Sequence, residues 1–305
     1  METFRKPDKP SKIHYHFSVK GVVVQVVSVK KEIKEAGYVS PYVRLNQHEF
    51  TLDIEGVGWF YARSGNYVAV LPAENASSST IDLYLNGSVC GAILHQRKTL
   101  PFHGSCFRHR GLGVMICGDS GVGKSSLTTA FCLRGADFLT DDVTPVLFKN
   151  NKPHIQAGSD RIKLWDDSLQ QLNQTRNGLE RIMPEREKFY FPMLSNTHTP
   201  VSLDLIIRLH VYDQPGTTIE PLTGVPCFTA LRNEIFRGDY LPGMPDSETA
   251  YLSQLITISR VVRVINVYRP RTITIERLRA ELVQLIDSLV PGRTAREGVT
   301  KTYTR

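Results

Sequence analysis

The chain has 305 residues, of which 41% are hydrophobic and 22% are charged, and its formal net charge at pH 7 is +7. This is the composition of an ordinary globular protein, and the length suggests about two domains. The sequence argues against a secretory signal, a membrane-spanning helix and a nucleic-acid-binding face, because it has a charged start, no run of roughly 18 apolar residues, and scattered basic residues. We therefore expect a cytoplasmic protein.

Short runs of alternating apolar and polar residues follow one another from about residue 12 to residue 73. The runs are Ile13–Phe17, Val22–Val26, Phe50–Ile54, Trp59–Tyr61 and Tyr67–Leu71. A period of two residues is typical of strands with one buried face. The sequence therefore predicts a small β-rich N-terminal region, which we place at residues 1–78. Its sheet edge is a candidate for binding a substrate peptide by strand addition.

A helix is predicted next, because the turn-like segment Asn75–Thr80 ends in a helix N-cap and apolar residues recur at helical intervals over Ile81–His95. This helix would link the N-terminal region to the rest of the chain. Trp59 and Trp165 are expected to be core residues.

From Leu100 onward, predicted strands alternate with predicted helices. The strands are Phe102–Phe107, Gly113–Cys117, Asp137–Thr140, Leu203–Val211 and Val261–Val267, and the helices are Leu127–Leu133, Ser247–Ile258 and Thr274–Leu289. Such alternation predicts an α/β fold with a mixed or parallel sheet and a ligand at its carboxyl edge. We place this domain at residues 79–292 and expect residues 293–305 to form a polar tail.

Residues 118–125 read Gly-Asp-Ser-Gly-Val-Gly-Lys-Ser and match the phosphate-binding pattern G-x-x-x-x-G-K-[ST] at every fixed position. The glycines let backbone N–H groups approach phosphate oxygens, and the following helix adds its positive N-terminal end. A chance match in a glycine-rich turn is the alternative, and the predicted strand and helix on either side argue against it. The expected nucleotide-binding residues are Gly118, Asp119, Ser120, Gly121, Val122, Gly123, Lys124, Ser125 and Ser126.

The motif also assigns two side-chain roles. Lys124 would reach the β- and γ-phosphates, and the Ser125 hydroxyl would coordinate a magnesium ion. The expected ligand is therefore Mg-ATP or Mg-GTP.

Two adjacent carboxylates, Asp141 and Asp142, end the strand that should follow the motif helix. A crossover connection would return this strand end to the ligand edge of the sheet. One carboxylate could then hold magnesium while the other accepts the proton of an incoming hydroxyl. The alternative is a turn or helix-capping pair, which the motif upstream disfavours. His103 lies on the strand predicted before the motif strand, where a lone histidine is more often structural than catalytic.

In this order, the His103-Gly104 pair, the motif at 118–125, Arg134-Gly135 and the Asp141-Asp142 pair resemble the catalytic core of the HPr kinase/phosphorylase family. These are P-loop serine kinases unrelated in fold to the eukaryotic protein kinases.

A closer resemblance is to HPr kinase-like proteins that lack the usual N-terminal domain. Some of these accompany lasso-peptide clusters and phosphorylate the precursor peptide near its C-terminus. The tripeptides Leu94-His95-Gln96 and Leu164-Trp165-Asp166 carry this part of the resemblance, and its specific part covers about residues 90–168.

The resemblance implies a P-loop kinase core with a mixed sheet, which transfers the γ-phosphate of Mg-ATP to a serine hydroxyl of a peptide or protein. It implies that Lys124 acts in catalysis and binds phosphate together with Ser125. Asp142 would be the base, Asp141 with Ser125 would lie on the metal side, and His103 would lie beside the carboxylates.

Two features depart from the family pattern. The family places a metal-binding glutamate on a strand after the aspartate pair, whereas here no glutamate occurs between Asp142 and Glu180, and Asp160 is the candidate replacement. The family's C-terminal signature loop is also not recognisable, which argues against HPr itself as the acceptor.

Two other functions stay open on the sequence. One is a small-molecule or nucleotide kinase, for which the charged segment Arg181–Lys188 could form a lid over the phosphates. The other is a nucleotide-binding regulator without turnover, in which the aspartates hold metal alone. The expected partners are a nucleotide and a peptide or protein acceptor, without nucleic acid or membrane. A homo-oligomer, the nucleotide base and reversal with phosphate are left open.

Overall fold

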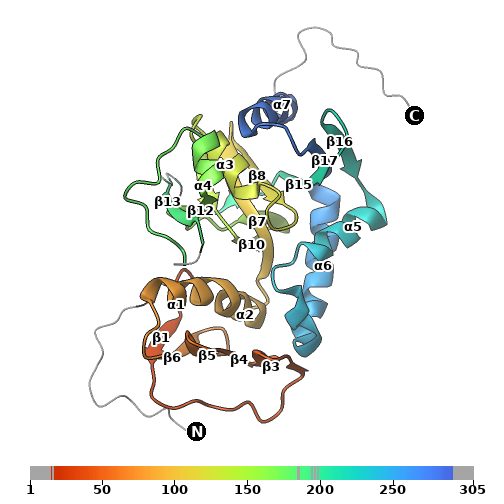
Figure 1. Cartoon of the computed structure of the whole chain (residues 1–305). Helices are drawn as coiled ribbons and strands as arrows, with labels where there is room; N and C mark the ends of the chain where they lie inside the picture. Colours follow the sequence, from red (N-terminus) through yellow and green to blue (C-terminus); the bar gives the residue numbers. More distant parts are fainter. Residues whose placement is uncertain are drawn as a thin grey trace.

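The computed structural model describes residue 15 and residues 17–183, 186–193, 195, 197 and 199–290. Within these residues, the strands form a six-stranded, a nine-stranded and a two-stranded sheet. Figure 1 shows the six-stranded sheet at one end of the molecule and the larger sheet toward the other, with helices α1 (Ser78–Tyr84) and α2 (Cys90–Gln96) between them.

The N-terminal sheet has the strand order β1-β6-β5-β4-β3-β2. Its strands are β1 (Val23–Val26), β2 (Tyr38–Val39), β3 (Val43–Leu45), β4 (Glu49–Ile54), β5 (Gly58–Arg63) and β6 (Tyr67–Pro72). The predicted β-rich region is thus confirmed. The strand predicted at Ile13–Phe17 lies partly outside the described residues, and the described residues Tyr15 and Phe17 belong to no strand.

One continuous helical segment covers this sheet. It consists of α1, a π-helical stretch η1 (Leu85–Val89) and α2, so the predicted helix is confirmed with a π-helical middle. It begins where the Ser77 hydroxyl accepts a hydrogen bond from Thr80 N at 3.1 Å, the usual role of an N-cap serine. Leu85 and Ile93 pack into the same apolar cluster as Phe60 of the sheet. The division into domains at residue 78 stays a prediction.

The large sheet runs in the order β14-β11-β10-β7-β8-β15-β17-β16, and β9 pairs with β7. Its strands are β7 (Leu100–His109), β8 (Leu112–Cys117), β9 (Asp137–Thr140), β10 (Val143–Lys149), β11 (Lys152–Ile155), β14 (Val201–Ser202), β15 (Leu205–Tyr212), β16 (Thr218–Leu222) and β17 (Arg263–Pro270). β15 is parallel to β8 and β17, whereas β7 and β16 run antiparallel to their neighbours, so the sheet is mixed.

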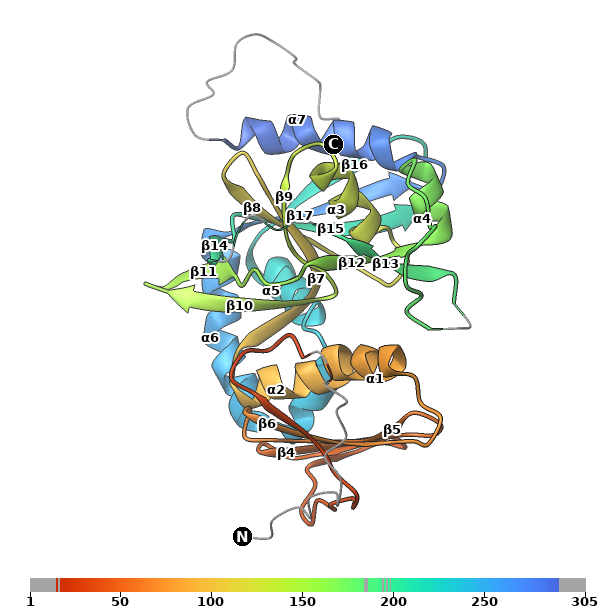
Figure 2. The same cartoon turned by 90° about the vertical axis from the view of Figure 1, so that its left-hand side faces the viewer.

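Helices cover both faces of the large sheet (Figure 2). They are α3 (Lys124–Cys132), α4 (Asp166–Gln171), α5 (Gly224–Asn233), the 3-10 helix η2 (Gly238–Gly243), α6 (Pro245–Val261) and α7 (Ile275–Ser288), and β12 (Arg161–Trp165) with β13 (Lys188–Pro192) forms the two-stranded sheet. Phe131 of α3 and Leu282 of α7 pack in one cluster with sheet residues, and Leu231 of α5 and Leu255 of α6 pack in another. The predicted α/β class with a mixed sheet and a β-rich N-terminal region is therefore confirmed. Among the described residues, no helix has both the length and the hydropathy needed to cross a membrane.

His95, at the end of α2, connects the N-terminal region to the rest of the chain through hydrogen bonds. Its ring is fully buried, with Nδ1 3.0 Å from the Tyr251 hydroxyl and Nε2 3.0 Å from the Phe236 carbonyl oxygen. The Ser247 hydroxyl donates to the His95 carbonyl oxygen at 2.7 Å. Burial lowers the pKa of His95 from 6.5 to about 4, because the charged ring loses its hydration.

Because of the lowered pKa of His95, we expect the free energy of unfolding to fall in mild acid. The unfolded chain takes up a proton at His95 near pH 6.5, whereas the folded chain resists it down to about pH 4. Its contribution is complete above pH 6.5 and falls by roughly 3 kcal/mol as the pH drops to 4. Chemical unfolding measures the free energy of unfolding of wild type and of His95→Gln across this pH range. Plotted against pH, the two free energies should converge in acid. Parallel curves, as expected for the exposed control His48→Gln, would contradict the assignment.

Candidate active site

The phosphate-binding motif forms the loop between β8 and α3, at the carboxyl end of a strand inside the large sheet. Gly118, Gly121 and Gly123 have φ angles of +127°, +87° and +101°, a region that side chains with a Cβ rarely adopt. Arg269 from β17 clamps the loop, because its Nε and Nη2 donate to the Val122 carbonyl oxygen at 3.0 and 2.9 Å. The predicted strand-loop-helix setting is therefore observed.

The loop glycines differ in how much space surrounds them, and this predicts a difference in stability. A Cβ on Gly118 would lie 2.4 Å from the Leu209 carbonyl oxygen, whereas a Cβ on Gly121 would meet nothing within 4 Å. Gly118→Ala should therefore lower the free energy of unfolding by about 2 kcal/mol more than the matched change Gly121→Ala. Urea denaturation measures the difference, and equal losses would show that the close approach to β15 is not maintained in solution.

Lys124 begins α3 and is almost fully buried, with 8% of its surface exposed. Its ammonium donates to the carbonyl oxygens of Gly118 at 2.7 Å and Asp119 at 3.0 Å. Within the described part of the chain, no carboxylate forms an ion pair with Lys124. An anion placed at the loop would therefore meet no competing carboxylate at the Lys124 ammonium.

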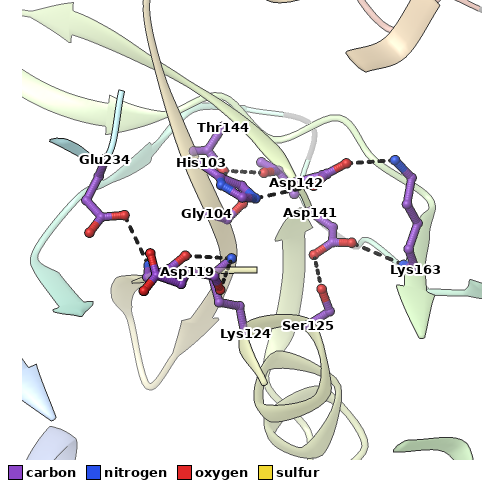
Figure 3. A network of polar contacts seen from close by, with 12 residues as sticks. His103, Gly104, Asp119, Lys124, Ser125, Asp141, Asp142, Thr144, Lys163 and Glu234 are labelled. Carbon is purple, nitrogen blue, oxygen red and sulfur yellow. Dashed lines mark hydrogen bonds and ion pairs between the residues drawn. The ribbon is translucent and has the colours of Figure 1, made fainter. Parts of the chain in front are cut away.

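Asp141 and Asp142 follow β9 directly and point in different directions (Figure 3). Asp141 accepts hydrogen bonds from the Ser125 hydroxyl at 2.8 Å and from Lys163 N at 3.1 Å. Asp142 Oδ2 lies 2.7 Å from Lys163 Nζ, and its Oδ1 lies 3.6 Å from His103 Nε2. Asp142 has a left-handed φ of +71°, which turns its side chain away from that of Asp141. His103 lies directly opposite Val143 in the pairing of β7 with β10.

The two aspartates differ in their acidity. Burial raises the pKa of Asp141, and the neighbouring charge of Asp142 raises it further. Burial would also raise the pKa of Asp142, but the Lys163 ammonium and the His103 ring together hold it well below its usual range. Asp142 is therefore an ionised acceptor throughout the neutral pH range, while Asp141 binds a proton or a cation more readily.

The donor set fits a magnesium ion shared with a nucleotide. The Ser125 hydroxyl and Asp141 Oδ1 are 2.8 Å apart, close to the roughly 3 Å that separates adjacent oxygens around Mg²⁺. No group of three or more potential ligands among His, Cys, Asp and Glu occurs in the described ranges. Ser125 and Asp141 would thus be the protein ligands, with phosphate and water oxygens completing the shell, which is the usual pattern for Mg²⁺.

A cavity of about 710 Å³, here called the phosphate-loop cavity, joins these groups. Of the predicted site residues, those that line it are His103, Ser120, Gly121, Val122, Gly123, Lys124, Ser125, Ser126, Asp141 and Asp142. Gly118 and Asp119 are not among its lining residues and support the loop from behind, through the carbonyl oxygens that hold Lys124. The volume lies within the range of cavities that bind nucleotide-sized ligands.

Two residues of the site, Lys163 and Glu234, were not predicted from the sequence. Lys163 on β12 bonds to both aspartates, through its backbone N and its ammonium. Glu234, just after α5, accepts a hydrogen bond from Gly118 N at 3.1 Å, and its carbonyl oxygen accepts one from His103 N at 2.8 Å. Its other carboxylate oxygen accepts from Arg208 Nε at 2.9 Å. No motif marks either residue, because each reaches the site only through the sheet topology.

The prediction that Trp165 is a core residue was wrong. Its surface is 41% exposed, and it lines the phosphate-loop cavity with the Lys188 ammonium 5.5 Å from its ring centre, whereas Trp59 is buried as expected. Lys188 lies at the end of the segment considered as a lid, which includes two residues outside the described ranges. Asp160 lines a different cavity and not the phosphate-loop cavity, so the structure does not place it beside Ser125.

No protein-family model matches the chain, and no curated protein matches it. Among solved structures, the chain is similar to the HPr(Ser) kinase/phosphatase from Coxiella burnetii, with 15% sequence identity and a TM-score of 0.33, over 62% of this chain and 95% of that one. At this level of similarity, a functional assignment rests on the residues and geometry of this chain.

Proposed function

We propose that this protein is an ATP-dependent kinase that transfers the γ-phosphate of Mg-ATP to a serine hydroxyl of a peptide or protein. The observation that carries the proposal is that one cavity, the phosphate-loop cavity, is lined by the phosphate-binding loop, its lysine and the pair of aspartates. The 2.8 Å hydrogen bond between the Ser125 hydroxyl and Asp141 joins the loop to the aspartate pair. These are the groups that phosphoryl transfer requires.

The chemistry follows from the charges of the site. Loop N–H groups, the N-terminal end of α3 and the Lys124 ammonium stabilise negative charge on the transferring phosphoryl group. Magnesium, when bound by Ser125 and Asp141, supplies further charge neutralisation. Asp142 orients the acceptor hydroxyl and takes its proton. Its lowered pKa suits this role, because in a loose transition state the proton leaves late and orientation matters more than basicity.

His103 contributes position rather than bond making. Its ring faces Asp142 Oδ1, and its backbone is fixed by Glu234, so it holds one side of the base in place. On this proposal, Lys163 and His103 are positioning residues that keep Asp142 ionised and aimed at the acceptor.

The finer assignments are part of the same proposal. The sequence resemblance supports the C-terminal region of a lasso-peptide precursor as the acceptor. Residues 79–292 would then form the catalytic domain and residues 1–78 would contribute to substrate binding, while the polar tail predicted at residues 293–305 lies outside the described residues.

Incubation with γ-labelled ATP and Mg²⁺ tests the proposal. Serine-containing peptides and proteins are compared with small hydroxyl compounds, and with a sample from which magnesium is removed by chelation. We expect label on serine, dependent on magnesium. Label on small compounds alone would favour the small-molecule kinase, and nucleotide binding without transfer to any acceptor would favour the regulator.

A further inference from the structure

A second cavity of about 320 Å³ opens behind the aspartate pair. Asp141, Asp142 and Lys163 line both this cavity and the phosphate-loop cavity. The phosphate loop itself contributes no residue to the second cavity, whereas Asn86 and Leu94 of the N-terminal helical segment do. A group in the second cavity would therefore approach Asp142 from the side away from the phosphate loop.

The floor of the second cavity is an apolar strip on β10 that begins directly after Asp142. Val143, Pro145 and Leu147 line the cavity and are half-buried, while the alternate residues Thr144 and Val146 are buried in the core. Because a strand rises about 3.3 Å per residue, the strip is roughly 13 Å long from Val143 to Leu147. Its length fits a few residues of extended polypeptide.

Other residues that line the second cavity add apolar surface and positive charge. Val19 and Leu94 belong to the N-terminal part of the chain. Lys20, Arg97 and Arg161 add cations, against the single carboxylate of Asp160 outside the aspartate pair, and Arg161 also pairs with Glu180 at 4.0 Å. The Arg97 guanidinium is occupied with backbone carbonyl oxygens of the N-terminal region, so its charge has no carboxylate partner among the described residues. The cavity therefore favours an occupant that is apolar with some negative charge.

We propose that the second cavity binds the acceptor, which is an extended peptide segment. In this segment, the residue before or after the acceptor serine is apolar, and its side chain packs on the β10 strip. This inference rests on the proposed function and names its substrate class. The cavity also has polar lining residues, among them Asn86 and Gln156, but the strip itself offers carbon atoms, which suit an aliphatic side chain better than a sugar or nucleoside. The cations of the lining favour acidic residues farther along the segment.

The transfer step follows from this placement. The serine oxygen, presented from the second cavity, forms a bond to the γ-phosphorus of ATP held at the phosphate loop. The bond between that phosphorus and the β,γ-bridging oxygen breaks, and ADP leaves with the bond's electron pair. The hydroxyl proton passes to Asp142, so the products are phosphoserine and ADP.

Filling the second cavity is the direct test. Leu147→Arg places a long cation on the strip, and Leu252→Arg is the matched control, because Leu252 is 53% exposed on α6 and lines neither cavity. A positional-scanning library of serine peptides with labelled ATP reports acceptor use, and release of phosphate from ATP to water reports the transfer site alone. We expect Leu147→Arg to lower kcat/KM for the best peptide about tenfold or more, mainly through KM, with hydrolysis within about twofold of wild type.

A second variant keeps the test possible if Leu147→Arg misfolds. Gly158 lines the same cavity, and a Cβ there meets nothing within 4 Å, so Gly158→Trp adds bulk without displacing a packed side chain. It should raise KM in the same direction. In the library, wild type should prefer Leu, Ile, Val or Phe beside the serine over Lys, and acidic over basic residues farther away.

The outcomes separate the two proposals. Unchanged peptide kinetics in both cavity variants, or no preference for an apolar neighbour, would overturn the second cavity as the acceptor site and leave the kinase intact. If wild type phosphorylates small hydroxyl compounds and no peptide, the proposed function itself fails, and this inference fails with it.

Discussion

Asp142→Asn should lower the rate of phosphoryl transfer about 10³-fold, because the amide cannot accept the acceptor's proton or bear its charge. The change is mild for the backbone, since asparagine tolerates the left-handed φ of +71° that Asp142 adopts, whereas alanine would be strained there. Mg-ATP should still bind, because the phosphate loop, Lys124 and the Ser125–Asp141 pair are untouched. Single-turnover transfer from labelled ATP, together with calorimetric titration of Mg-ATP, measures both quantities.

The control for this variant is Asp239→Asn, which removes an exposed carboxylate that lines neither cavity. It should transfer phosphate at the wild-type rate. Transfer by Asp142→Asn within about threefold of wild type would exclude Asp142 as the base, since general-base catalysis supplies at least a hundredfold.

Lys124→Ala should lower kcat/KM for ATP by about 10³-fold, since it removes the buried cation that faces the phosphates. Unlike Asp142→Asn, it should also weaken Mg-ATP binding, because the charge acts on the bound triphosphate as well as on the transition state. The exposed Lys98, whose side chain is 48% exposed, provides the control Lys98→Ala. Calorimetry and steady-state kinetics on both variants make the comparison. ATP affinity equal to wild type in Lys124→Ala would place the triphosphate elsewhere.

The local features of the fold were predictable because they depend on neighbouring residues. The glycine motif, its flanking strand and helix, and the helix N-capped by Ser77 all follow from short patterns that the structure reproduces. The central position of β15 agrees with the strand predicted at Leu203–Val211, whose residues Leu205–Ile207 and Leu209 are buried. In these segments, periodicity and local chemistry favour the same conformation as tertiary packing.

β10 was missed for a specific physical reason. Pro145 normally argues against a strand, because it lacks a backbone N–H. Here it lies opposite Pro101 of β7, so neither residue has an N–H to donate across the pair. Both carbonyl oxygens instead accept from outside that pair, from Gln156 N at 3.0 Å and Phe236 N at 2.9 Å. The two prolines fit each other, and a single segment of sequence cannot show that.

The candidate site was predictable only where its parts are close in sequence. The phosphate loop and the aspartate pair follow each other along the chain, but Lys163 and Glu234 arrive from β12 and the end of α5. Trp165 has the side chain of a core residue, and only the position of β12 beside the cavity exposes it. These three contributions depend on topology rather than on local pattern.

The central claim is that a triphosphate bound by the loop places its terminal phosphate beside Asp142. A crystal structure of the protein with Mg²⁺ and the β,γ-imido analogue of ATP tests it most directly. We predict a terminal phosphate in hydrogen-bond contact with Lys124 and facing the Asp142 carboxylate, with magnesium on Ser125 and Asp141. A terminal phosphate that lies away from both aspartates, or a nucleotide bound outside the loop, would contradict the account.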